Sequence, residues 1–454
     1  MPLGESYCCC LVVAVVVKPK LLSLFPSDID SLMEKTETTF TNVIAKGDRK
    51  RGMTELRLPE HQRNHDWVYL RDGWFLGALF PCLVAIIYLL ATNPARIEET
   101  NFAQVTRIYG GFTAFVIYLW LLGVNFIIWN RYKVNYVFIF EFDPRHHIEI
   151  PNYFELVAFF SSLIAYSYFM YLVGVGSPHF PPDYHPAILF GVFMVILFFP
   201  FNLFYKKSRI WLLKEFWRII TAPLYKVEFA DFFLGDQFCS LVYVLLSVQY
   251  TACIYAASGS ESVFLCDQHK GGFAIFLAVI PSYFRLLQNF RRYRDLRDKS
   301  LLVNAGKYAT AMMVPITAGL SRIFGGTPLL VLWLFAAVSS WIYSSIWDIK
   351  RDWSLLDRTA PHKFLRQKLA FPYPWVYYVC IPLDIVLRGA FIVTLSENPA
   401  NPQLRDFFLA VAEIYRRFQW NFFRLENEHL NNAGRFRAVK EVPLPASIAT
   451  HGSS

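Results

Sequence analysis

The chain has 454 residues, of which 55% are hydrophobic and 17% are charged. This composition excludes an ordinary soluble domain of the same length and indicates an integral membrane protein. The formal net charge is +9. In a membrane protein such an excess is typical of cytoplasmic loops facing anionic lipid, and it argues against a nucleic-acid partner.

The first part of the chain is expected to precede the membrane region. Residues 8–17 are apolar but too short to span a bilayer, and they lack the basic residues that begin a signal peptide. Residues 28–58 are polar, follow a helical pattern and contain a basic cluster at 46–51. They are interpreted as a soluble amphipathic helix that leads to the membrane.

Ten hydrophobic segments follow, and most approach the roughly 20 apolar residues that cross a bilayer. They lie at residues 74–91, 110–129, 154–175, 187–205, 232–256, 272–290, 308–320, 328–347, 375–395 and 404–423. The seventh is short. The sequence therefore predicts an all-α integral membrane protein with about ten transmembrane helices.

The loops between these segments differ sharply in charge. If the N-terminus is cytoplasmic, the inner loops near residues 206–226, 291–299 and 350–368 are rich in Lys and Arg. The outer loop at 174–186 has neither residue, and the outer loop at 257–271 has only Lys270. This asymmetry follows the positive-inside rule and predicts that both termini are cytoplasmic.

Neither the cysteines nor the known catalytic motifs indicate an enzyme. Cys8, Cys9 and Cys10 are adjacent, and no pair of the eight cysteines has the spacing of a metal or disulfide site, so they are interpreted as small buried hydrophobes. Nucleophile-elbow, zinc-protease, Walker and dinucleotide patterns are absent. We therefore expect no catalysis, metal or cofactor.

Charged residues within the last six segments are the strongest functional signal. A charge at this depth costs roughly 3 kcal/mol or more on insertion scales, so each requires a reason. The first four segments are nearly free of charge and are expected to be scaffold or dimer-facing helices, and the last six the working unit. The polar positions are Asp236, Arg285, Lys307, Tyr308, Asp348, Asp352, Asp384, Arg388, Glu413, Arg416 and Arg417.

These charges allow two interpretations. Asp384 with Arg388, and Glu413 with Arg417, are four residues apart and could be structural ion pairs on one helix face. Alternatively, the charges meet in a wet cavity that binds an anion. Arg and Lys suit oxyanions, whereas carboxylates accept hydrogen bonds only from an anion that still carries a proton, so the mixture favours phosphate over sulfate.

Several motifs resemble those of the EXS-domain family, which includes phosphate exporters. They are FADFFLGDQ, RRYRD, LVNAGKY, WDIKRDW and RRFQWNFFRLENEHLNN, and the resemblance spans about residues 28–442. It implies a homodimer that exports phosphate along a pathway lined by segments five to ten. The positions that match phosphate-contacting residues are Asp236, Arg285, Lys307, Tyr308, Asp348, Arg388, Arg416 and Arg417.

The resemblance also assigns further positions. Arg292 and Asp352 match residues near the inner mouth, and Asp384 and Glu413 match supporting charges. Phe391 stands where the resemblance places a Trp that acts as a gate in animal members of the family. Cys239 stands where the family has an Asn, which weakens polar contact there.

Four parts of the chain are expected. Residues 1–65 would be a cytosolic segment with a remnant of the last SPX helix, 66–210 a four-helix scaffold and dimerisation part, 211–442 the six-helix EXS transport core, and 443–454 a cytosolic tail. The family's SPX domain binds inositol pyrophosphates. Because most of that domain has no counterpart here, regulation of this chain by inositol pyrophosphates is not expected.

The sequence thus predicts a phosphate exporter driven by the phosphate gradient and the negative-inside potential. The alternative is a membrane signalling or trafficking scaffold without transport, in which the charges pair off. An intramembrane enzyme would need a water-exposed nucleophile, which the sequence does not show. The plasma membrane is the expected location, with the Golgi or another endomembrane as the alternative.

Overall fold

The computed structural model describes residues 26–43, 46–49, 53, 66–92, 102–142, 147–174, 182, 184–256, 266, 272–395 and 401–431. Two compact units are distinguished. In one of them, helix α2 (Pro26–Val43) overlaps the predicted amphipathic segment 28–58 and begins two residues before it. The other unit is the helical bundle. The expectations for residues 8–17 and 443–454 lie outside the described residues.

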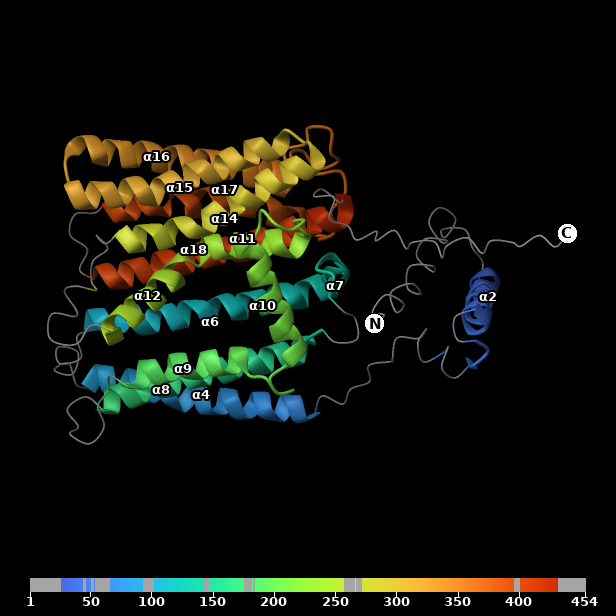
Figure 1. The fold of residues 1–454 in the computed structure, drawn as a ribbon, viewed down its shortest axis with the longest axis horizontal. Coiled ribbons are helices and arrows are strands. Elements are labelled where there is room, and N and C mark those ends of the chain that lie inside the picture. The colour runs from blue at the N-terminus through green and yellow to red at the C-terminus, as the bar shows by residue number, and fades with distance from the viewer. Residues whose placement is uncertain are drawn as a thin grey trace. The chain divides into compact units, whose positions relative to one another are not determined.

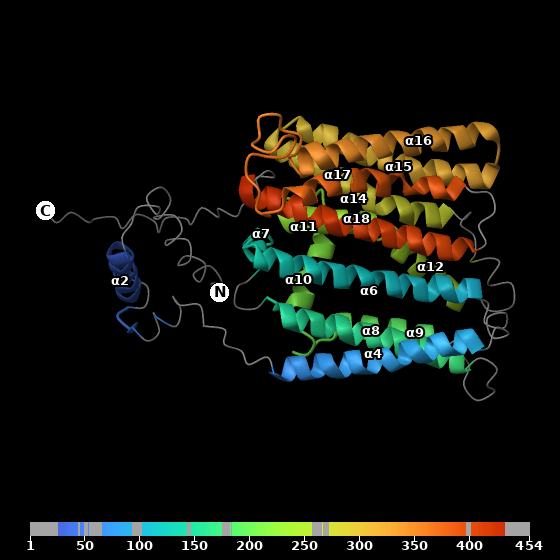
Figure 2. The same cartoon turned by 180° about the vertical axis from the view of Figure 1, so that it is seen from behind.

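The bundle begins with four apolar helices. Long apolar runs form helices in lipid because each helix satisfies its own backbone hydrogen bonds. Helix α4 packs along α8, while α6 lies between α8 and the later helices (Figures 1 and 2). The helices are α4 (Asp66–Thr92), α6 (Phe102–Arg131), α8 (Ile150–Gly174) and α9 (Tyr184–Phe198), with a short α7 (Tyr136–Ile139) after α6.

The later helices build the other half of the bundle. Two of them end in tighter or wider turns, since α16 runs into the π-helical turn η1 and α17 into the 3₁₀ segment η2. The elements are α10 (Lys206–Ile220), α11 (Phe229–Ser240), α12 (Val242–Ala256), α14 (Gly272–Leu296), α15 (Ser300–Phe324), α16 (Thr327–Trp347), η1 (Asp348–Asp352), α17 (Pro374–Arg388), η2 (Gly389–Leu395) and α18 (Pro402–Asn431).

The prediction of an all-α membrane protein is confirmed, because all elements in the described ranges are helical. Within the described ranges, six helices are long and apolar enough to cross a membrane, or seven if the bent pair α11–α12 is one span. The apolar helix α9, with 15 residues, is shorter than these six. The count of ten and the placement of both termini stay predictions.

Two predicted segments differ from the structure. Segment 187–205 was expected to be helical throughout, but α9 ends at Phe198 because Pro200 follows and cannot continue the helix. Segment 232–256 was expected to be one helix, but it breaks at Leu241 with a bend of 66°. Neither Gly nor Pro stands at that break, so the residue pattern does not reveal it.

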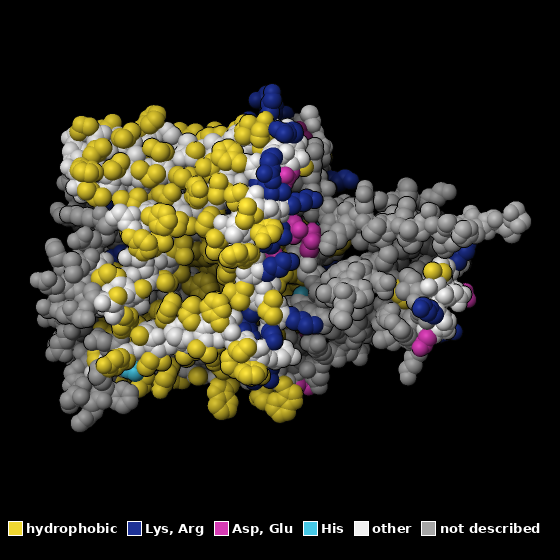
Figure 3. Space-filling model, viewed as in Figure 1, with side chains coloured by type: hydrophobic (Ala, Val, Ile, Leu, Met, Phe, Trp, Pro, Cys, Tyr) yellow, Lys and Arg dark blue, Asp and Glu magenta, His cyan; other side chains and the backbone are white. Residues whose placement is uncertain are grey.

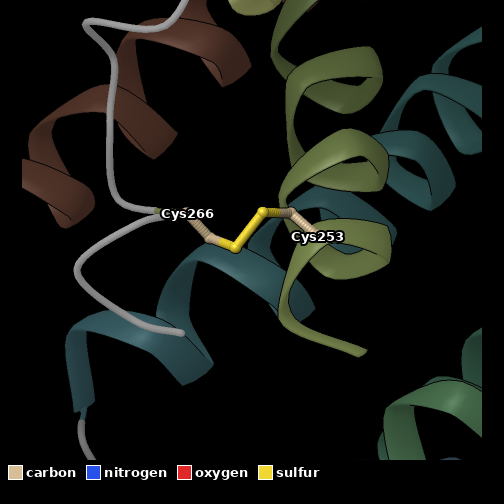
Figure 4. The surroundings of a disulfide bond; sticks show 2 residues. All are labelled: Cys253 and Cys266. Atoms are coloured by element: carbon tan, nitrogen blue, oxygen red, sulfur yellow. A yellow bond between two sulfur atoms is a disulfide. The ribbon is translucent and has the colours of Figure 1, made fainter. Parts of the chain in front are cut away.

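Basic side chains gather at one end of the bundle on the face shown in Figure 3. By the positive-inside rule, we expect this to be the cytoplasmic end. At the end of α12, Cys253 forms a disulfide with Cys266 (Figure 4). The prediction that no cysteines pair was therefore wrong, because folding and not a recognisable spacing brings these residues together. Disulfides persist in oxidising compartments, which supports a non-cytoplasmic position for Cys253 and Cys266.

Candidate functional site

A cavity of about 380 Å³ lies among the later helices of the bundle. A water molecule needs ~10–15 Å³ of such space, so the cavity has room for an oxyanion with several waters. Its charged and phenolic lining residues are Asp236, Lys307, Tyr308, Asp348, Asp352, Arg388, Glu413, Arg416 and Arg417. Unlike charges from α11, α15, η1, α17 and α18 therefore meet around one space.

Asp236 is the centre of the first group of contacts. Its Oδ1 accepts hydrogen bonds from Arg285 Nε at 2.9 Å and from the Tyr308 hydroxyl at 2.5 Å. Arg285 also donates from Nη1 to Gln288 Oε1 at 2.5 Å. The second carboxylate oxygen of Asp236 and the Nη2 of Arg285 are buried and have no hydrogen-bond partner among the described residues. A buried unpaired donor and acceptor beside a cavity require an explanation, and a ligand or ordered water supplies one.

The bundle folds around Arg285 in a way that only a glycine on α11 permits. A Cβ at Gly235 would lie 2.7 Å from Arg285 Cδ and 3.2 Å from Gln288 Oε1. Gln288 is fully buried and donates in turn to the backbone oxygen of Asp231 at 3.1 Å. The guanidinium of Arg285 is thus held at a fixed angle to α11.

Lys307 and Arg417 are cations that form no direct ion pair with any residue that the structure describes. The Lys307 ammonium lies 4.5 Å from the centre of the Tyr308 ring and 5.6 Å from that of Trp347, and it forms no ion pair with any residue in the described ranges. Arg417 donates to Ser240 Oγ at 2.8 Å and lies over the Trp420 ring at 4.5 Å. Both side chains are at least nine-tenths buried. A cation–π contact compensates the cost of burying a charge only in part, by about 2 kcal/mol when the contact is desolvated.

The remaining cations are paired. Arg388 donates to Asp348, and its Nε lies 3.5 Å from Asp384 Oδ2. Arg416 Nη1 reaches Asp384 at 3.2 Å and Asp348 at 3.4 Å, and its other two nitrogens grip Glu413 at 2.6 and 2.7 Å. The predicted Asp384–Arg388 pair therefore exists. Glu413 pairs with Arg416 instead of Arg417, because Arg417 is directed to Ser240.

The predicted residues fall into two groups. All the predicted phosphate-contacting residues line the cavity except Arg285, which acts through Asp236. Of the other candidates, Asp352 and Glu413 line the cavity, whereas Asp384, Arg292 and Phe391 do not. Phe391 packs edge-on against Trp333 and Trp341, with ring centroids 6.4 and 6.1 Å away.

Sequence reasoning missed the serine hydroxyl groups of the cavity. Ser340 and Ser344 line it together with Asp348 and Asp352, and these four positions are each four residues apart. Such spacing gives one face of α16 and η1 a continuous polar stripe. This four-residue spacing is the sequence signal from which Ser340 and Ser344 could have been predicted. Ser282 on α14 also lines the cavity but has no such neighbours.

Comparison with known proteins agrees with this architecture. The EXS family model matches residues 105–430. The xenotropic and polytropic retrovirus receptor 1 homolog of Xenopus laevis is 35% identical to this chain over an alignment of 457 residues. The alignment covers 93% of this chain and 64% of the relative. Solute carrier family 53 member 1 of Homo sapiens is 36% identical over 453 residues, covering 93% and 65%.

The chain thus spans about two thirds of the length of these relatives. The match to the EXS model includes every residue that lines the cavity. The resemblance inferred from the motifs is therefore confirmed: the chain belongs to the EXS family.

Proposed function

We propose that this chain is a transporter that carries inorganic phosphate out of the cytoplasm through the cavity. The observation that carries the proposal is the pair of cations, Lys307 and Arg417, that line the cavity without a carboxylate partner. A buried cation that forms no direct ion pair is unfavourable for folding, so an anionic ligand is the simplest reason to keep two of them. A solute-carrier name in the relatives is in keeping with a transporter and not an enzyme.

The cavity lining suits an anion that retains a proton. Four carboxylates (Asp236, Asp348, Asp352 and Glu413) and four cations (Lys307, Arg388, Arg416 and Arg417) line it. Because these charges balance, a fully ionised anion gains little from the site as a whole. Protonated phosphate can accept from the cations and donate to a carboxylate, whereas sulfate leaves that acceptor unpaired.

A stepwise binding route follows from the contacts. Lys307 and Arg417 would meet the anion first, since neither has to leave an acidic partner. Arg388 and Arg416 would then exchange part of their contact with Asp348 for contact with phosphate. The negative-inside potential drives the anion outward without a pump.

The alternative of a membrane scaffold without transport expects every charge to be paired. The contacts of Arg388 and Arg416 fit that expectation, but those of Lys307 and Arg417 do not. Transport is therefore the function that we favour.

Other features belong to the same proposal. We propose a homodimer that uses the first helices, because α4 exposes large aromatic side chains such as Trp67, Trp74 and Phe80. Arg292, Asp352 and Phe391 would act at the entrance and exit. We place the protein in the plasma membrane, with the Golgi or another endomembrane as the alternative.

Release of labelled phosphate from liposomes that contain the purified chain tests the transport function. Arg417→Gln should slow release at least tenfold, because it removes a cavity cation that forms no ion pair with the described residues. Arg405→Gln is the matched control on the same helix. Arg405 forms an ion pair with Asp406, with an N–O distance of 2.9 Å, and it does not line the cavity. Equal release by both variants and the wild type would remove the basis for this site.

A further inference from the structure

The amphipathic helix α10 differs from every other long helix in the bundle. Its sequence, KKSRIWLLKEFWRII, mixes basic and apolar residues, and it crosses the bundle axis instead of running along it (Figures 1 and 2). It lies in the band of Lys and Arg at the cytoplasmic end (Figure 3). A helix of this composition and orientation is typical of the membrane interface.

The basic residues of α10 divide into two sets. Its arginines are used inside the protein: Arg209 donates to six backbone oxygens at and after the end of α9, and Arg218 donates two hydrogen bonds of 2.8 Å to Asp231. Its lysines form no ion pair with any residue for which the structure gives a position. These lysines are Lys206, Lys207 and Lys214.

Exposed apolar side chains alternate with these lysines. Lys207, Ile210, Lys214 and Trp217 follow at helical spacing on one exposed stripe. Ile210 is 53% exposed and Trp217 is 60% exposed. A soluble polyanion would not bind the apolar side chains of this stripe. A lipid has a charged headgroup for the lysines and acyl chains for the apolar side chains.

The surface beside α10 is hollowed. Figure 3 shows a recess lined by hydrophobic side chains next to α10, with α9 on one side, α12 and α14 on the other, and α6 behind. The bordering helices carry exposed apolar side chains, such as Ile188 and Val195 on α9 and Val248 on α12. The recess opens sideways, toward the hydrocarbon of a surrounding bilayer.

We propose that α10 and this recess form a binding site for an anionic phospholipid. The lysines of α10 bind the charged headgroup, and an acyl chain fills the recess. Arg218 links the site to transport, because its partner Asp231 lies on α11 five residues before Asp236. A lipid that holds α10 in place therefore also holds the helix that carries a cavity carboxylate.

Lipid retention tests the proposal without any use of transport. The purified full chain is titrated with phosphatidylserine and phosphatidylcholine of equal chain length, and bound lipid is counted by native mass spectrometry. The wild type should prefer phosphatidylserine. The triple variant Lys206→Gln, Lys207→Gln, Lys214→Gln should lose that preference by roughly 100-fold, since each lysine near anionic lipid contributes about fivefold.

The matched control carries the same three changes at Lys299, Lys350 and Lys363, which are exposed lysines of the same end. It should retain the preference, and an equal loss in both variants would show only a general charge effect and overturn the site. Two further arms test the ligand. Dihexanoyl phosphatidylserine should bind more weakly than the long-chain lipid, and inorganic phosphate should not displace either. Displacement by phosphate, or equal binding of the short lipid, would overturn the lipid assignment.

Discussion

Lys307→Met gives the sharpest test of whether the cavity charges exist for folding or for binding. If the ammonium were a structural ion pair, its removal would destabilise the protein. In this structure it contacts only the Tyr308 and Trp347 rings among the described groups, so its removal takes away a buried cation that has no acidic partner.

The magnitude follows from two opposing contributions. Burial of an ion costs several kcal/mol after relaxation. The two ring contacts return about 2 kcal/mol, and Asp236, Asp348 and Asp352, which line the same cavity, attract the ammonium from beyond ion-pair distance. We therefore expect Lys307→Met to raise the unfolding free energy by about 1–2 kcal/mol, while it abolishes phosphate release.

Arg285→Met is the matched comparison. Arg285 is as deeply buried as Lys307 but holds Asp236 at 2.9 Å. Its removal leaves a buried carboxylate unpaired and should cost about 3–5 kcal/mol. Both variants are unfolded by heat or denaturant in the same detergent. If Lys307→Met is destabilised as strongly as Arg285→Met, the lysine is structural and our reasoning fails.

Three further predictions concern other parts of the chain. Asp236→Asn should lower the preference for phosphate over sulfate about tenfold in competition uptake, since the amide can donate to sulfate; an unchanged ratio would contradict this role. Burial, followed by the adjacent Asp231, raises the pKa of Glu215 from 4.5 to about 8, in a cluster with Arg218 and Glu228. The folded state therefore keeps a proton that the unfolded chain releases, so stability should fall as pH rises from 4.5 to 8, and Glu215→Gln should flatten this slope in thermal unfolding. Cys253→Ser should lower stability by about 3 kcal/mol, and impermeant maleimide should label Cys266 in this variant only from the non-cytoplasmic side.

The apolar pattern predicted the helical class and most helix positions, because about 20 apolar residues in a row have few alternatives in a bilayer. It failed where a local contact decides the chain's path. The break at Leu241 has no helix breaker; Ser240 instead hydrogen-bonds to Glu413 at 2.7 Å, from a helix distant in sequence. No single-sequence pattern carries that information.

Most of the charged residues that line the cavity were predictable, but their pairing was not. Charges deep in apolar segments identified the residues around the cavity, since each such charge is costly. Which charges neutralise each other depends on side-chain direction across helices. Glu413 could reach either Arg416 or Arg417 by spacing alone, and packing directs Arg417 to Ser240. The Cys253–Cys266 disulfide was hidden for the same reason.

The bend between α11 and α12 has an electrostatic consequence that no side chain supplies. Val242, the first residue of α12, lines the cavity, so the positive end of that helix's dipole is directed to the space where an anion would lie. This backbone field is independent of pH, and substitution of individual side chains leaves it in place. An anion in the cavity would therefore keep part of its attraction even after every basic side chain around it had been replaced.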